Sequence, residues 1–213
     1  MNFDQLFQRY ESLVAKTNQA FQKMQKDYGE CIKCKLHCSD CCHAIFGLFL
    51  IEAAYLQRHF KELSIKEKRA ALLRGENSEK EHRELEKKLK LYANDPHMTS
   101  YCLSKERIRC PLLNDHQECI LYIYRPITCR LYGIPLVIKG KAHVCGKAGF
   151  KNGDYYSTFN LDEAHRELYL LSRELLGRAG NKDLERASLL ISVSKAIKTP
   201  FTDLINEDLG YSS

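Results

Sequence analysis

The sequence predicts a mainly α-helical protein in which helices flank an irregular, cysteine-rich region with a small β-hairpin. Apolar residues recur at three- and four-residue steps near both ends of the chain, which is the period of an amphipathic helix. All ten cysteines fall between residues 31 and 145, most of them in stretches where this period is weak. At 213 residues the chain is long enough for one domain with a substantial core, so we expect a single domain over residues 1–213.

The N-terminal part is predicted to be helical on both sides of a first cysteine run, residues 31–42. Apolar residues at helical spacing mark residues 2–27 as an amphipathic helix, and Gly29 is expected to end it. A second, more apolar helix is expected over residues 44–60, with one acidic residue, Glu52, inside it. The two helices would therefore flank the first cysteine run.

A long charged helix is expected next. Ser64 and Glu67 have the spacing of a capping box, in which each side chain bonds to the backbone of the other residue. The helix is predicted to run to about Tyr92 and to stop before Pro96, because proline disfavours a helical residue ahead of it. Residues 74–88 are almost entirely charged, so we expect this part to be a solvated arm whose end docks through Leu85, Leu89 and Tyr92.

The next part, residues 97–150, is expected to be irregular apart from one hairpin, because its periodicity is weak. The hairpin is predicted from residues 134–138 and 142–144, which lie on either side of a glycine-containing turn. Helices are expected again over residues 160–177 and 183–198. This C-terminal helical pair completes the predicted domain.

The cysteines are clustered in a way that an apolar core does not require. Five of the ten fall in residues 31–42, at the spacing that thiolate ligands of soft metals and iron–sulfur clusters use. The candidate metal ligands are Cys31, Cys34, Cys38, Cys41, Cys42, Cys110, Cys119, Cys129 and Cys145. Cys102 lies outside any spaced set and is predicted to be a packed thiol.

The adjacent cysteines Cys41 and Cys42 restrict how the first run can bind a metal ion. In extended backbone, neighbouring side chains point to opposite faces, so both sulfurs can hardly bind one ion without strain. Either the pair serves two different metals, or one thiol supports the site or is redox-active.

The expected compartment is the cytoplasm. The start of the chain has no secretory signal pattern, and no apolar run approaches the roughly 20 residues that a membrane span needs. Because cytoplasmic thiols are kept reduced, ten cysteines indicate metal or redox chemistry rather than a disulfide framework. No membrane partner is expected.

Positive charge is concentrated in one segment. Residues 105–151 contain nine basic and three acidic residues, which accounts for the whole net charge of +6. A basic segment can bind nucleic acid, but it can equally offset a thiolate-ligated cluster, which is anionic. The second interpretation needs no further partner, so nucleic acid is not expected, whereas a redox or protein partner remains open.

The spacing of the first cysteine run does not select one metal motif. A zinc ribbon needs two Cys-x2-Cys pairs about 15 to 20 residues apart, and here the two pairs are nearly adjacent. In the ferredoxin pattern, His37 occupies the place of the third cysteine. The spacing Cys34-x3-Cys38-x2-Cys41 resembles that of the radical S-adenosylmethionine enzymes. However, Asp40 stands where those motifs normally carry an aromatic residue, and the chain has no βα alternation.

Four elements together resemble one family. They are Cys38-Ser-Asp-Cys41-Cys42, Cys110-Pro-Leu-Leu, Cys119-Ile-Leu-Tyr and Arg125-Pro-Ile-Thr-Cys129-Arg130-Leu-Tyr-Gly. This set resembles the YkgJ-type cysteine-cluster family (CxxCxxCC) of zinc- or iron-chelating proteins, which includes a domain of the flagellin lysine methylases. The resemblance covers residues 31–145 and implies a metal or iron–sulfur site. The chain departs from the family pattern at its start, where the first cysteine of the pattern would fall on Lys35 and Cys34 lies one position earlier.

We expect a metal-binding cysteine-cluster protein that holds an iron–sulfur cluster, preferably of the 4Fe–4S type, for electron transfer or accessory redox chemistry. A structural zinc module that binds another protein is the alternative. Methyl transfer, by analogy with the methylases of the family, is a further alternative, although no glycine-rich nucleotide loop follows a predicted strand. The sequence does not decide whether the protein is an enzyme.

Arg125 and Arg130 bracket Cys129 and are the candidate cofactor-binding residues. A guanidinium stays charged and carries five donors, so beside ligating sulfurs it would raise the reduction potential. The histidines are mostly not expected to be ligands. The exceptions to test, which lie near candidate cysteines, are His37, His43, His116 and His143.

Overall fold

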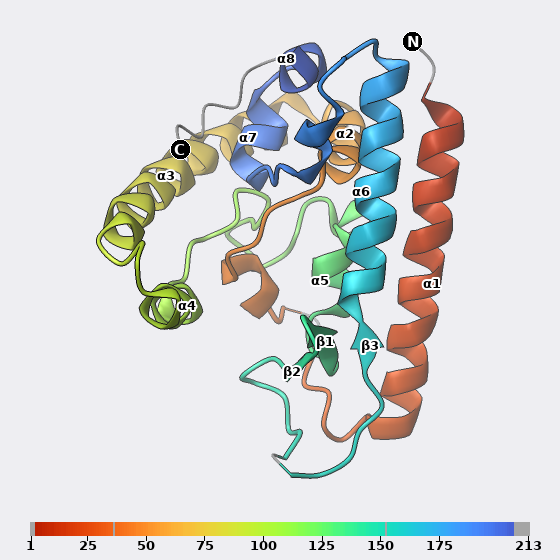
Figure 1. Ribbon diagram of the computed structural model, residues 1–213, viewed down its shortest axis with the longest axis vertical. Helices are drawn as coiled ribbons and strands as arrows, with labels where there is room; N and C mark the ends of the chain where they lie inside the picture. Colours follow the sequence, from red (N-terminus) through yellow and green to blue (C-terminus); the bar gives the residue numbers. More distant parts are fainter. Residues whose placement is uncertain (1–2, 36, 152, 207–213) are drawn as a thin grey trace.

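The computed structural model describes residues 3–35, 37–151 and 153–206 and is mainly helical, as predicted (Figure 1). The α-helices are α1 (Asp4–Tyr28), α2 (Leu50–Phe60), α3 (Ile65–Lys90), α4 (Pro96–Lys105), α5 (Ile127–Leu131), α6 (Leu161–Arg178), α7 (Val193–Lys198) and α8 (Phe201–Asn206). The short 3-10 helices are η1 (Asp40–His43), η2 (Tyr122–Tyr124) and η3 (Leu184–Ser188). The strands are β1 (Leu136–Ile138), β2 (Lys141–His143) and β3 (Phe159–Asn160).

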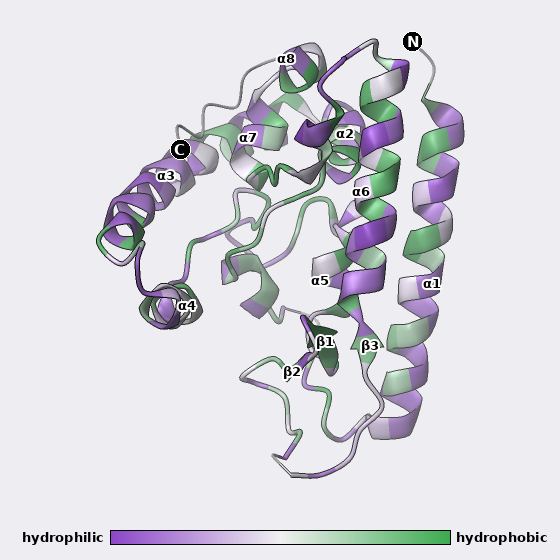
Figure 2. Ribbon diagram, in the orientation of Figure 1, coloured by the Kyte–Doolittle hydropathy of each residue, from purple (hydrophilic) through white to green (hydrophobic). Residues whose placement is uncertain are grey.

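The long helices α1 and α6 lie side by side along one edge of the molecule, and α2 packs against both of them. Their apolar faces enclose the core, which contains Tyr10 of α1, Leu56 of α2 and Leu175 of α6, each at most 1 % exposed. Figure 2 shows the apolar residues of α1 and α6 as bands between hydrophilic ones, which is the pattern of helices half-facing solvent. No α-helix in the described ranges is long and apolar enough to cross a membrane.

The first predicted helix is confirmed as α1, although Asn2 lies outside the described residues. Gly29 follows its end with a φ of −56°, so it keeps a right-handed conformation and does not form a left-handed cap. The first cysteine run begins immediately afterwards, where the Cys31 amide donates to the Tyr28 carbonyl over 2.9 Å.

The second predicted helix, residues 44–60, begins six residues later than expected, at Leu50. Leu48 pairs with Ile191 through two backbone hydrogen bonds of 2.8 and 2.9 Å, which hold this stretch extended. The Glu52 carboxylate accepts a bond from the Phe49 amide over 3.2 Å and so fixes the helix start. The prediction was wrong here because a short apolar run does not distinguish a buried extended segment from a helix.

The capping box at Ser64 and Glu67 is present, and α3 begins where it was predicted to begin. The prediction that residues 74–88 form a solvated arm is wrong for one face of the helix. Gly75 and Ser78 are buried on that face, and α3 packs against α7. Leu85 is buried as expected. Figure 2 shows that most of α3 is hydrophilic, which is why the charge pattern predicted a fully solvated helix.

Helix α4 was not predicted, because residues 97–150 were expected to be irregular apart from the hairpin. Asp95 caps this helix, and its carboxylate accepts bonds from the His97 and Met98 amides over 3.0 Å each. Pro96 occupies the first turn, where its missing N–H has no cost. The sequence therefore did contain a helix start signal at the proline that was interpreted only as a stop.

The predicted hairpin is confirmed as β1 and β2. Ile138 pairs with Lys141, so the loop contains two residues, Lys139 and Gly140, with φ of 50° and 71°. Positive φ at both positions is the geometry of a type I′ turn. The sheet also has a third strand, β3, which pairs in parallel with β1 and was not predicted.

Residues 160–177 form α6 with Asn160 as its cap, as predicted, but residues 183–198 are not one helix. They divide into η3, an extended stretch and α7. The extended stretch contains Ile191, which pairs with Leu48. Ser192 then caps α7 by accepting a bond from the Lys195 amide over 3.1 Å. A contact between distant parts of the chain has overridden a helical sequence period.

Candidate metal centre

The backbone brings the first cysteine run against the segment that follows α4. The Cys110 amide donates to the Cys42 carbonyl over 2.7 Å, and the Ile108 amide donates to the His43 carbonyl over 3.2 Å. Helices α2, α3 and α4 lie between these two segments in the chain. The folded main chain therefore joins the two cysteine-bearing parts without any disulfide among the ten cysteines.

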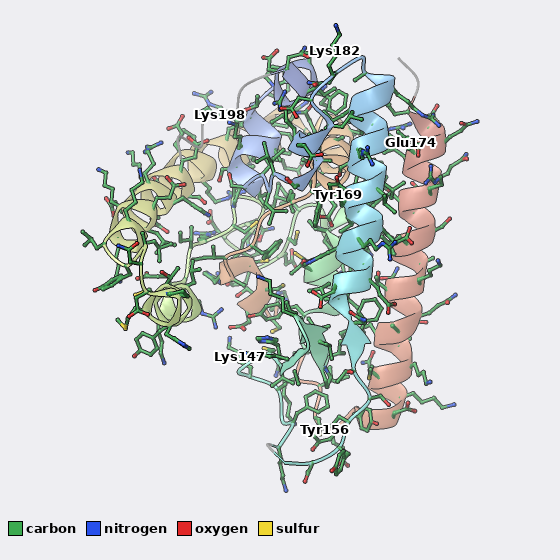
Figure 3. The ribbon with its side chains drawn as sticks, in the orientation of Figure 1. Lys147, Tyr156, Tyr169, Glu174, Lys182 and Lys198 are labelled. Atoms are coloured by element: carbon green, nitrogen blue, oxygen red, sulfur yellow. The ribbon has the colours of Figure 1, made fainter. Side chains whose placement is uncertain are left out.

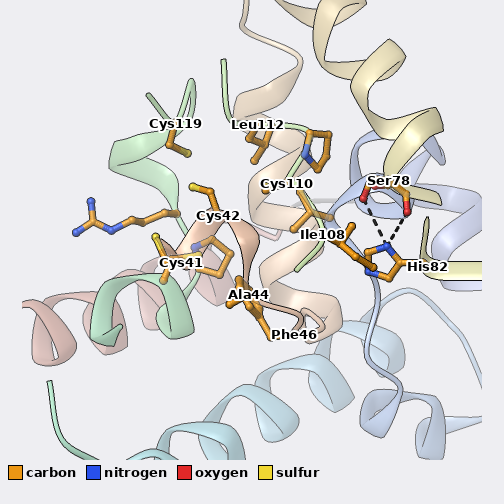
Figure 4. Close-up of a pocket in the computed structure, with 16 residues that line it drawn as sticks. Cys41, Cys42, Ala44, Phe46, Ser78, His82, Ile108, Cys110, Leu112 and Cys119 are labelled. Atoms are coloured by element: carbon orange, nitrogen blue, oxygen red, sulfur yellow. Dashed lines mark hydrogen bonds between the residues drawn. The ribbon is translucent and has the colours of Figure 1, made fainter. Parts of the chain in front are cut away.

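Five of the predicted ligands line one cavity of about 40 Å³ (Figure 4). They are Cys41, Cys42, Cys110, Cys119 and Cys129. A single water needs roughly 10 to 15 Å³ of such space, so the cavity has room for a few atoms between the thiols. We call this set the cavity thiols.

The cavity thiols are positioned by several local structures. Cys41 and Cys42 lie in η1, Cys119 forms an isolated bridge with Leu113, and Cys129 lies in the short helix α5. The start of α5 is fixed by Glu52, whose carboxylate accepts a bond from the Ile127 amide over 2.9 Å. Burial raises the pKa of Glu52 to about 7.

The protonation of the cavity thiols depends on burial and on one another. Cys42 donates a hydrogen bond to Cys41, which lowers the pKa of Cys41 to about 7 and raises that of Cys42. Burial raises the pKa of Cys110 to about 12 and that of Cys129 well above its usual range. Several of these thiols therefore stay protonated at neutral pH unless a cation stabilises their thiolates.

Three further predicted ligands, Cys34, Cys38 and Cys145, are absent from the lining of this cavity. Cys34 donates to the Tyr132 carbonyl over 3.3 Å, and Cys145 donates to the Asp40 carboxylate over 3.4 Å. The Tyr132 hydroxyl also donates to Asp40, so Cys145 and Tyr132 meet at this carboxylate, and Cys34 lies beside Tyr132. Burial raises the pKa of Cys34 to about 11, and the charge of Cys38 adds to this shift.

The other two cysteines, Cys31 and Cys102, are also absent from the lining of the cavity. The Cys31 carbonyl accepts a bond from the Gly149 amide over 2.7 Å, which ties the start of the run to the loop after Cys145. Cys102 is buried in α4 with 7 % of its surface exposed, so its prediction as a packed thiol is confirmed.

The structure separates the two arginines that the sequence grouped together. Arg125 lines the cavity, and its guanidinium lies 3.8 Å from the centre of the Tyr122 ring. Arg130 is buried at 7 % exposure and donates to the carbonyls of Arg125 and Ile123 and to Asn18. Arg125 therefore adjoins the cavity thiols, whereas the donors of Arg130 hold the backbone of the preceding turn.

The opposite wall of the cavity contains residues that the sequence did not single out. They are Ser78 and His82 of α3 and Ser194 of α7. His82 Nδ1 donates to the Ser78 carbonyl over 2.8 Å, as the dashed line in Figure 4 marks. Ser194 Oγ is buried without a hydrogen-bond partner. A serine four residues before a histidine is too common a pattern to have indicated this wall.

The four histidines named as exceptions behave mainly as hydrogen-bonding or exposed residues. His43 donates to the Ser39 carbonyl over 3.0 Å, and His37 lies 3.8 Å from Glu118. His116 and His143 are exposed.

The donor set fits a soft metal, although its side chains are not arranged as ligands. In the described part of the chain, no three His, Cys, Asp or Glu side chains stand together in positions that would hold a metal ion. However, the five cavity thiols face a cavity whose lining contains no carboxylate. A cysteine side chain has one torsion with three staggered positions, so its sulfur can reorient while the backbone stays in place.

Comparisons of the chain with protein-family models, curated proteins and solved structures found no match. The resemblance to the cysteine-cluster family therefore stays a prediction from the motifs.

Proposed function

We propose that this protein is a metal-binding cysteine-cluster protein that holds an iron–sulfur cluster, preferably of the 4Fe–4S type. The observation that carries the proposal is the set of cavity thiols, which come from two parts of the chain far apart in sequence and share one cavity. A 4Fe–4S cluster needs four cysteine ligands, and the cavity supplies five candidates. When bound, the cluster would supply one-electron transfer.

The residues of the chain would each have a definite task around the cluster. The cavity thiols would lose their protons and bind iron. Glu52 would hold α5, and with it Cys129, at the cavity by its bond to the Ile127 amide. Arg125 would offset the negative charge of the thiolates and raise the reduction potential.

A structural zinc site is the second candidate, and a specific observation favours it. Cys110 and Cys42 belong to segments that are far apart in sequence and already share a backbone hydrogen bond. A zinc ion held by four of the cavity thiols would secure this contact and contribute directly to folding. In that case the protein would present a surface to another protein rather than transfer electrons.

Anaerobic purification followed by metal analysis tests the proposal. We expect a brown protein with iron and inorganic sulfide in equal amounts, and a broad visible absorption that bleaches on reduction. Cys110→Ser and Cys129→Ser should lose the colour, whereas Cys102→Ser should keep it. A colourless protein containing zinc would support the second candidate, and a protein without any metal would reject both.

The proposal includes a compartment and a class of partner. All ten cysteines are free, which is the state that cytoplasmic proteins maintain. We propose a cytoplasmic protein whose partner is a redox protein or another protein, and not nucleic acid.

A further inference from the structure

One buried serine hydroxyl lies at the cavity without a hydrogen-bond partner among the described residues. Ser194 of α7 lines the cavity and is 2 % exposed, and its Oγ bonds to no other described group. A buried polar group without a partner costs free energy, because its hydration is lost and nothing replaces it. Such groups are rare in native proteins, and each needs an explanation, which can be a ligand or ion that supplies the partner.

The other buried hydroxyl side chains in the described ranges all have partners. Thr17 donates to a carbonyl three residues earlier in its own helix over 2.8 Å, and Ser172 Oγ accepts a bond from a backbone amide of α2 over 3.1 Å. The Ser78 hydroxyl lies 3.5 Å from Nδ1 of His82. Ser194 therefore differs from serines and threonines that are equally buried in the same fold.

The usual local partner of a helical serine is already in use here. Such a hydroxyl can donate to the carbonyl three or four residues earlier. The carbonyl three residues before Ser194 belongs to Ile191, and it accepts a bond from the Leu48 amide over 2.8 Å. The pairing that holds two distant segments together thus occupies the acceptor that the Ser194 hydroxyl would otherwise find.

Packing from two sides holds Ser194 at the cavity. The buried Gln57 side chain donates to the Ala196 carbonyl over 3.0 Å and so fixes α7 against α2. On the other side α3 comes close, since a Cβ atom on Gly75 would lie 3.8 Å from the Cβ atoms of both Ser194 and Pro111. Pro111 also lines the cavity and directly follows one of the cavity thiols in the chain.

The chemistry of the cavity indicates what the missing partner would be. Figure 4 shows Cys41, Cys42 and Cys119 on one side and Ser78 and His82 on the opposite side, where these two bond to each other. The lining contains no carboxylate that could accept from a serine hydroxyl. A group held by thiolates does offer acceptors, because its sulfur atoms carry negative charge.

We propose that the Ser194 hydroxyl donates a hydrogen bond to a sulfur atom of the metal group that the cavity thiols hold. The inference rests on the proposed function and adds to it a residue that acts on the group through its sulfurs without binding the metal. On an iron–sulfur cluster the donated bond would stabilise the more negative, reduced state and so raise the reduction potential. At a zinc site it would stabilise a thiolate and strengthen binding of the ion.

Ser194→Ala tests the proposal, with Ser172→Ala as the matched control because it removes an equally buried hydroxyl that does not line the cavity. In metal-free protein, Ser194→Ala should unfold at the same urea concentration as the wild type or at a higher one, because an unpartnered polar atom is removed. Ser172→Ala should unfold at a lower one, because a backbone amide loses its acceptor.

The metal-loaded protein should show the opposite order of effects. Ser194→Ala should keep the iron and sulfide content but change the ratio of oxidised to reduced cluster at least threefold at a fixed potential, towards the oxidised form. Ser172→Ala should keep the potential of the wild type. If the protein contains zinc instead, Ser194→Ala should bind it at least threefold more weakly in competition with a chelator, and Ser172→Ala should bind it as the wild type does.

The possible failures separate this inference from the proposed function. If Ser194→Ala binds metal with an unchanged potential or zinc affinity, or if Ser172→Ala changes it equally, the inference is overturned and the proposed function stands. It is also overturned if Ser194→Ala destabilises the metal-free protein as much as Ser172→Ala does, because the hydroxyl then has a partner without the metal. A wild type that binds neither iron nor zinc rejects both.

Discussion

Glu52 shows how a single buried side chain connects the core to the candidate site. Its carboxylate bonds to the Phe49 amide at the start of α2 and to the Ile127 amide at the start of α5. The side chain is 3 % exposed, and burial raises its pKa to about 7. An ionisable group in such a position must make the stability of the fold depend on pH.

The first prediction gives the sign of this dependence. The pKa of Glu52 in the folded protein lies above that of an exposed glutamate, about 4.3. Its contribution to the free energy of unfolding is therefore fully present below about pH 4 and is lost as the pH rises through 7. The loss amounts to at most about 4 kcal/mol. Urea unfolding of metal-free protein between pH 4 and 8 measures it, and Glu52→Gln should show a smaller slope. Equal slopes would contradict the assignment.

The second prediction separates Arg125 from Arg130, which the sequence could only treat as a pair. Arg125→Gln should keep the metal but lower the reduction potential, because a positive charge leaves the cavity wall. Arg130→Gln should lower the free energy of unfolding by about 2 to 4 kcal/mol, since buried carbonyls lose their donors. Redox titration and chemical denaturation of both variants measure the two effects. A lower potential in Arg130→Gln alone would reverse the assignment.

At the scale of elements, helix caps and turns could be predicted from residues close together in sequence. Elements that depend on contacts between distant residues could not. The caps at Ser64 and Asn160 and the turn at Gly140 were readable because each depends on residues a few positions away. The pairing of Leu48 with Ile191 converted two predicted helical stretches into extended chain, and nothing near either residue indicates it.

The candidate site follows the same rule. The cysteines could be identified as candidate metal ligands from their spacing, because thiols at such intervals have few other uses. Which of them line one cavity could not be predicted, because that depends on how segments far apart in sequence pack against one another. The cavity wall formed by His82 and Ser194 was missed for the same reason, since α3 was expected to be solvated.

The third prediction compares two glycines in different elements. Gly177 lies inside α6, where an added Cβ would meet only Leu184 at 4.0 Å, so Gly177→Ala should raise the free energy of unfolding by up to about 1 kcal/mol. Gly140 lies in the hairpin turn with a φ of +71°, so Gly140→Ala should lower it by about 1 to 2 kcal/mol. Thermal unfolding of both variants measures the difference, and shifts of the same sign would contradict the turn geometry.

At the scale of the whole molecule, the cysteine-bearing segments act as the junction between distant parts of the chain. Residues 44–109, which include α2, α3 and α4, leave η1, and the chain returns to it at Cys110 (Figure 1). Figure 3 shows many charged side chains projecting into solvent from α3, so this helix of the excursion has little apolar surface to bury, whereas α2 packs into the core. Backbone bonds at the junction, such as the one from the Cys110 amide to the Cys42 carbonyl, join its two ends, in addition to the packing of α2 and α3 against α7. A metal bound by the cavity thiols would therefore stabilise the molecule where the loop closes.

The fourth prediction follows from this closure. A metal that binds only the folded state raises the free energy of unfolding with its concentration, by about 2.7 kcal/mol when free metal exceeds the dissociation constant a hundredfold. Removing the metal anaerobically should therefore lower the denaturation midpoint and increase hydrogen exchange at the Ile108 and Cys110 amides, which cross the junction. The amides in the middle of α1 serve as the internal control, because α1 is a continuous helix outside the junction and its amides exchange only when the whole protein unfolds.

In Cys110→Ser the metal should no longer change the denaturation midpoint or the hydrogen exchange at the junction. Unchanged exchange at the junction after complete metal removal would mean that the backbone alone closes the loop, and that the thiols do not contribute to the fold through a metal.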